Sequence, residues 1–154
     1  MTATSLKIAT WNILGRRVHS TNKVADDGAV ERILRQHPVD VLCLQEVHFY
    51  DGAADRQLLA ELEAVGLRHF VGQPLSPSHL DSTAGLGLGV ASREPLKRVG
   101  KFMLTNPGVR ASVRGEDWML HDKGMVGCTL EATAGRTLCV YSLHLFPFFE
   151  EEVQ

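Results

Sequence analysis

Three polar side chains in this 154-residue chain follow or interrupt apolar runs. Asn12 closes the segment LKIATWN, Glu46 follows VDVLCLQ, and His144 lies within LCVYSLHL. A carboxylate can bind a hard divalent cation, an amide can add a neutral oxygen ligand, and an imidazole can gain or lose a proton near neutral pH. As residue types, the three could support metal-assisted chemistry if the fold brings them together.

The elements that must position Asn12 and Glu46 are predicted by hydrophobic periodicity. Residues 6–13 alternate as a strand does, and residues 39–47 form an apolar run typical of a strand that is covered on both faces. Between them, residues 29–36 have helical spacing. A strand, helix, strand unit predicts parallel pairing, with both carboxyl ends at the edge where such sheets bind ligands.

The rest of the chain predicts one more helix and then strands. An apolar stripe within residues 58–65 ends at Gly66, and further strands are expected at residues 86–93, 97–104, 124–131 and 137–146. Residues 73–84 and 105–118 are expected to be loops. We therefore predict an α+β fold in a single domain, residues 1–154, with the late strands on the same mixed sheet as the early ones. The last strand places His144 on one face with Leu138, Val140 and Ser142.

Composition limits the classes of protein that fit. The formal net charge is -2, which argues against binding nucleic acid by bulk electrostatics alone. We find no signal peptide and no apolar run of the roughly 18 residues that a membrane span needs, so we expect a cytoplasmic protein without a transmembrane segment. The three cysteines are odd in number and fit reduced core thiols better than a disulfide framework.

Each candidate residue also has an ordinary structural explanation. Asn12 and Glu46 could be the first exposed residues beyond their strands. A single histidine in an apolar strand is more often a hydrogen-bonded core residue than a catalyst. The residues alone leave both interpretations open.

Four segments together resemble the ordered motifs of the endonuclease/exonuclease/phosphatase superfamily, which has the deoxyribonuclease I-like fold. They are TWNI at 10–13, LQEV at 44–47, GLGVASREP at 87–95 and SLHL at 142–145. The resemblance implies half of a four-layer α/β/β/α sandwich and hydrolysis of a phosphodiester or phosphate ester that depends on Mg²⁺ or Mn²⁺. The implied substrate is a nucleic acid, a phospholipid or a small phosphate ester.

The resemblance also implies roles for the three residues. Glu46 would be the carboxylate ligand of the metal, Asn12 an amide that contacts the metal or the phosphate, and His144 the imidazole beside the scissile phosphate. These roles suit Mg²⁺, which keeps several waters and takes one or two carboxylates together with phosphate oxygens.

The superfamily's later motifs, Gly-Asp-x-Asn and Ser-Asp-His, have no counterpart in this sequence. We therefore expect only the first half of the site, with poor activity or none for the chain alone. The alternative is a non-catalytic half-domain that associates with itself or with a second chain. Two helices can cover only one face of the expected sheet. We therefore expect the opposite face of the sheet, which bears Leu138 and Val140, to be uncovered. That face would mediate a homodimer or contact with a missing C-terminal half.

Overall fold

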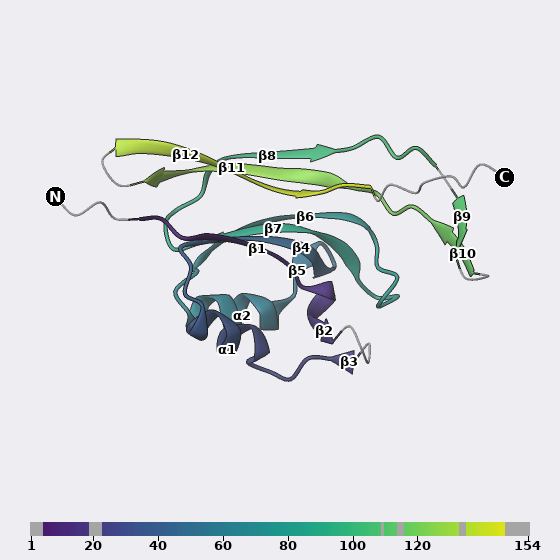
Figure 1. Ribbon diagram of the computed structural model, residues 1–154, viewed down its shortest axis with the longest axis horizontal. Helices are drawn as coiled ribbons and strands as arrows, with labels where there is room; N and C mark the ends of the chain where they lie inside the picture. The colour runs from purple at the N-terminus through teal and green to yellow at the C-terminus, as the bar shows by residue number, and fades with distance from the viewer. Residues whose placement is uncertain (1–4, 19–22, 109, 114–115, 133–134, 147–154) are drawn as a thin grey trace.

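The computed structural model describes residues 5–18, 23–108, 110–113, 116–132 and 135–146. These residues form three layers: two helices, a mixed β-sheet, and a second sheet on the opposite face of the first (Figure 1). The α+β class with two early helices is as predicted.

The first sheet has strand order β1-β4-β7-β6, and a short fifth strand, β5, pairs with β4. Its strands are β1 (Ile8–Asn12), β4 (Val41–Tyr50), β5 (Ala53–Ala54), β6 (His69–Pro77) and β7 (Gly85–Ser92). The pair β1 and β4 is parallel, as predicted, whereas β7 is antiparallel to both β4 and β6. The parallel ladder ends where Asn12 lies opposite Gln45.

Two helices cover one face of this sheet. They are α1 (Ala29–Gln36), which has the predicted bounds, and α2 (Arg56–Ala64). Gly66 ends α2 as expected, because its φ of +88° permits the left-handed turn in which the Leu67 N–H bonds to the Leu62 carbonyl at 2.9 Å. No helix in the described ranges is long and apolar enough to cross a membrane.

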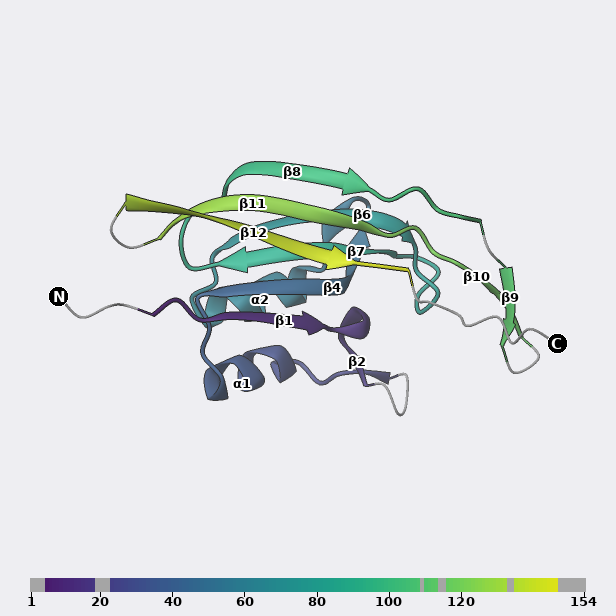
Figure 2. The same ribbon diagram turned by 45° about the horizontal axis from the view of Figure 1, so that its top comes forward.

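The second sheet corrects our prediction of a single mixed sheet. The strands β8 (Lys97–Met103), β11 (Gly124–Ala132) and β12 (Arg136–His144) form a separate antiparallel sheet, in the order β12-β11-β8. This sheet lies over β4 and β7 (Figure 2). Both faces of β4 are apolar, and the second sheet buries the face that the helices leave free.

The packing therefore has two cores. Leu42 and Leu44 of β4 face the helices, whereas Val41 and Cys43 face the second sheet. The prediction that the face with Leu138 and Val140 is uncovered is wrong. Val140 is only 6% exposed, and Leu138 packs against the core between the two sheets. The chain itself supplies the cover that we had assigned to a partner.

Two segments predicted to be loops contain strands. β6 extends through Pro77, and its prolines are tolerated because β6 is an edge strand. The segment 105–118 contains an antiparallel pair, β9 (Arg110–Val113) and β10 (Glu116–Met119). Three short elements complete the described chain: η1 (Leu14–Arg16), β2 (Arg17–Val18) and β3 (Lys23–Val24).

Candidate active site

Glu46 lies at a bulge inside β4, not at the end of the strand as we predicted. β4 continues to Tyr50, and its pairing with β7 shifts register between Gln45 and Val47. Glu46 has a φ of +56°, which costs a residue with a side chain on the order of 1–3 kcal/mol. Such strain persists only where the surrounding structure enforces it, and it is concentrated at functional sites.

The bulge determines the direction in which the Glu46 side chain points. Without the extra residue, strand alternation would turn Glu46 toward the helices, because Leu44 faces them. Instead, Gln45 and Glu46 both reach β12: the Gln45 amide lies 3.2 Å from the Ser142 hydroxyl, and Glu46 Oε1 lies 3.8 Å from His144 Nε2. Val47 then faces the helices. One inserted residue thus places the carboxylate between the two sheets.

His144, the last residue of β12, shares its face with Ser142 and Val140, as predicted. A small cleft brings His144 and Glu46 together with Lys123. The Lys123 ammonium lies 3.2 Å from Nε2 and 3.4 Å from Nδ1 of His144. A carboxylate, an imidazole and an ammonium group therefore meet where the two sheets approach each other.

The charges in the cleft act on one another. Burial lowers the pKa of His144, the Lys123 charge lowers it further, and Glu46 opposes both effects. Burial also lowers the pKa of Lys123, and Glu46 again opposes the effect. Because its pKa is below the ordinary 6.5, the His144 imidazole is mostly neutral at pH 7 and has one nitrogen that can accept a hydrogen bond.

Asn12 lies beside this cleft but is not one of its lining residues. It ends β1 as predicted and lies opposite Gln45, the residue before Glu46. Its side-chain Oδ1 accepts a hydrogen bond from the Leu14 N–H at 3.0 Å. The structure therefore brings the side chains of Glu46 and His144 within 3.8 Å of each other. Asn12 lies on the neighbouring strand, opposite the residue that precedes Glu46.

Sequence reasoning missed His79 and Lys123, which also line the cleft. His79 follows β6, and His121 and Lys123 precede β11, yet all three line the cleft with Glu46. The His79 and His121 rings stack with centroids 5.0 Å apart. Asp122 also lines the cleft, and it accepts a hydrogen bond from the Asn106 amide at 2.8 Å. These residues come from loops, so strand or helix periodicity contained no signal for them.

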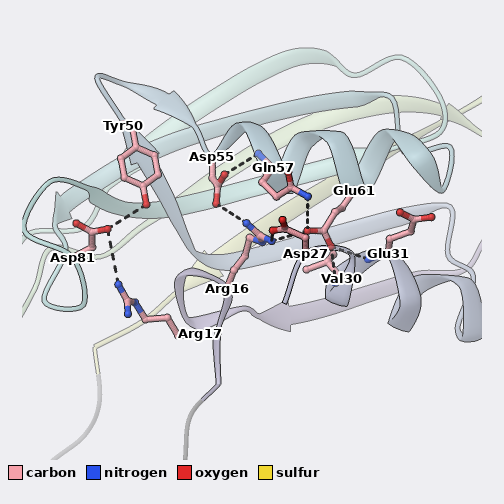
Figure 3. A network of polar contacts seen from close by, with 10 residues as sticks. All are labelled: Arg16, Arg17, Asp27, Val30, Glu31, Tyr50, Asp55, Gln57, Glu61 and Asp81. Carbon is pink, nitrogen blue, oxygen red and sulfur yellow. Dashed lines mark hydrogen bonds and ion pairs between the residues drawn. The ribbon is translucent and has the colours of Figure 1, made fainter. Parts of the chain in front are cut away.

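A buried polar network supports the turn that follows Asn12. Arg16, in this turn, bonds to Glu61 of α2 at 2.7 Å and to Asp55 at 3.3 Å (Figure 3). Glu61 also accepts hydrogen bonds from the N–H groups of Val30 and Glu31 at the start of α1. One buried carboxylate thus connects both helices to the turn beside the candidate site.

The cleft fits a hard divalent cation through one protein ligand. Glu46 Oε2 is buried and has no hydrogen-bond partner, a state that costs a polar group on the order of 1–3 kcal/mol. A carboxylate oxygen is a preferred ligand of Mg²⁺. Within the described ranges, no group of three or more His, Cys, Asp or Glu residues is placed to hold a metal. A cation at Glu46 would therefore keep most of its coordinating water.

Comparisons with known proteins identify the family of the chain. Residues 9–126 match the sequence profile of the Endonuclease/Exonuclease/phosphatase family, a range that includes Asn12 and Glu46 and ends before His144. A search of curated proteins gives no match.

Two solved structures have a similar fold. The endonuclease/exonuclease/phosphatase from Beutenbergia cavernae DSM 12333 is 22% identical, with a TM-score of 0.68, and the match covers 91% of this chain and 38% of that one. The family protein from Leptotrichia buccalis C-1013-b is 15% identical, with a TM-score of 0.62, and the match covers 92% of this chain and 55% of that one. This chain therefore spans about half or less of the length of either protein.

Proposed function

This chain belongs to the endonuclease/exonuclease/phosphatase family, and from that premise we propose that it takes part in metal-dependent hydrolysis of a phosphate ester or phosphodiester. In this proposal the chain supplies one half of the site. Glu46 would hold Mg²⁺ or Mn²⁺, with Asn12 at the margin as an amide that contacts the metal or the phosphate. A bound cation would supply positive charge to a phosphoryl oxygen.

The chain's own residues support this chemistry in distinct ways. The neutral imidazole of His144 can donate a hydrogen bond to a phosphoryl oxygen from one nitrogen and accept a proton at the other. The second sheet partly covers the cleft, where the side chains of Glu46 and His144 are 15% and 24% exposed, and such burial strengthens the interactions of a charge bound there. The Asn12 amide would add an oxygen ligand or a hydrogen bond without repelling an anionic substrate.

One observation carries the proposal: the unpartnered, buried Oε2 of Glu46, held by a bulge in a strained conformation beside His144. A purely structural carboxylate would be expected to have hydrogen-bond donors around both oxygens. The orphaned oxygen is therefore free to bind a cation.

Calorimetric titration of Mn²⁺ tests this assignment. We expect weak binding to the wild type and none to Glu46→Gln, which keeps the size of the side chain and removes its charge. The matched control is Glu131→Gln, an exposed carboxylate on the second sheet, which should bind as the wild type does. Identical isotherms for the wild type and Glu46→Gln would remove Glu46 from the site. Hydrolysis assays on a panel of phosphodiesters and phosphate monoesters with Mn²⁺ would then identify the substrate.

A second candidate function is association, with the chain acting as a non-catalytic half-domain. The observation that favours it is an apolar surface on the outer face of the second sheet, where Phe102, Tyr141 and Leu143 are each more than two-fifths exposed. Phe102 and Leu143 flank Met125 in register, so the surface runs across all three strands. Sedimentation at low micromolar concentration tests it: we expect a dimer that Leu143→Lys converts to monomer. A wild-type monomer with strong Mg²⁺-dependent hydrolysis would exclude this candidate.

A further inference from the structure

We propose that Lys123 binds an anionic oxygen of the substrate's phosphate group. The inference rests on the proposed function, because it assigns a substrate contact within the same cleft. It concerns a residue that the motif resemblance left without a role, in the loop just before β11.

The geometry leaves the Lys123 ammonium free to bind a ligand. Its Nζ atom is almost equally far from the two ring nitrogens of His144, at 3.2 and 3.4 Å. An ammonium group has three N–H donors, and a neutral imidazole has one nitrogen that can accept a hydrogen bond, so His144 takes at most one of them. The contact therefore leaves N–H donors of the ammonium available to an anion.

The backbone around Lys123 is held firmly between two strands. The Lys123 carbonyl accepts a hydrogen bond from the Leu104 N–H at 2.9 Å, and Gly124 pairs with Met103 on one side and His144 on the other. A Cβ atom at Gly124 would lie 2.5 Å from the Phe102 carbonyl oxygen, so only glycine permits this close approach. Lys123 is thus anchored at a fixed place relative to His144.

The distribution of charge in the cleft suits a phosphate that is shared between two groups. Glu46, with its unpartnered oxygen, forms a negative side that attracts a cation. Lys123 forms a positive side that attracts an anion, and lysine is a common phosphate ligand in proteins. Lys123 is half-buried and loses part of its solvation, a cost that an anionic ligand would offset. A phosphate bound to a divalent cation presents the complementary pair of charges.

Titration of inorganic phosphate in the presence of EDTA tests the inference separately from metal binding. We expect the wild type to bind phosphate weakly. The affinity of Lys123→Gln for phosphate should be lower by about tenfold or more, whereas Lys123→Arg should bind phosphate as the wild type does. The control is Lys7→Gln. Lys7 is exposed and precedes the first residue of β1, whereas Asn12 is the last residue of that strand. Circular dichroism and thermal unfolding would verify that each variant is folded.

The outcomes separate the two proposals. Phosphate binding that depends on Lys123, without any Mn²⁺ binding, would support this inference and contradict the proposed function. Mn²⁺ binding that depends on Glu46, with equal phosphate affinities for the wild type and Lys123→Gln, would overturn this inference alone. Failure of the wild type to bind phosphate, or loss of binding in Lys7→Gln to the same extent as in Lys123→Gln, would also overturn it.

Discussion

Among the described charged residues, Glu61 should be the one whose substitution lowers the free energy of unfolding most. Its carboxylate is 2% exposed and accepts hydrogen bonds from Arg16 at 2.7 Å and from the Val30 and Glu31 N–H groups at 2.8 and 3.1 Å. Glu61→Ala would leave the buried Arg16 guanidinium with Asp55 at 3.3 Å and the exposed Asp27 at 3.7 Å, and it would orphan two N–H groups. The perturbation thus affects a charge, a helix N-terminus and a turn at once.

The expected magnitude follows from these contacts. Removal of one partner from a buried ion pair costs about 3–5 kcal/mol when the other charge remains buried without compensation. Asp55 still compensates part of the Arg16 charge, so we expect Glu61→Ala to cost about 3 kcal/mol, the lower end of this range. Glu61→Gln keeps a hydrogen-bond acceptor and loses the charge, so we expect a smaller loss of about 1.5–3 kcal/mol. A small domain has a free energy of unfolding of about 5–15 kcal/mol, so Glu61→Ala should remove a large share of it.

Urea unfolding followed by circular dichroism measures these differences. The matched control is Asp27→Asn, because Asp27 lies 3.7 Å from the same guanidinium but is 88% exposed. We expect this variant to change the free energy of unfolding by no more than about 1 kcal/mol. The reasoning fails if Glu61→Ala unfolds within 1 kcal/mol of the wild type, or if Asp27→Asn loses as much stability as Glu61→Ala.

Three further predictions concern individual residues. A thiol reagent at pH 8 should label exposed Cys139 quickly and Cys43 only on unfolding, because burial raises the pKa of Cys43 to about 11; equal rates would contradict this. Burial and then the His79 ring lower the pKa of His121 below 6.5, so protonation should cost stability as the pH falls below that value. NMR titration should show that pKa rising in His79→Asn, and no change would refute the coupling. Gly66→Ala should cost about 1–2 kcal/mol in thermal unfolding because its φ is +88°, and an unchanged Tm would count against that conformation.

Local sequence patterns were sufficient for the elements that are determined by their own residues. The apolar spacing in residues 29–36 predicted α1 with the observed bounds, and Gly66 was recognised as the end of α2. The alternation in β1, the apolar run in β4 and the helix between them were enough to predict parallel pairing. These features are predictable because helix and strand periods and glycine's freedom at positive φ act over a few residues.

The candidate site was only partly predictable, although motif resemblance named Asn12, Glu46 and His144. The bulge that turns Glu46 toward His144 shows itself as a register shift against β7, a strand forty residues later in the chain. A strand pattern read by itself gives a side chain's face only up to the first bulge. The roles of these residues in metal binding and catalysis stay predictions.

Tertiary structure alone decided which strands share a sheet and which loops form the cleft. β8, β11 and β12 have the alternation of strands in either sheet, and their assignment to a second layer depends on the need to bury the second face of β4 and β7. That burial is a property of the assembled chain. For the same reason, Lys123 could be placed beside Glu46 only after both sheets had been brought together, because no short-range pattern connects residues so far apart in the sequence.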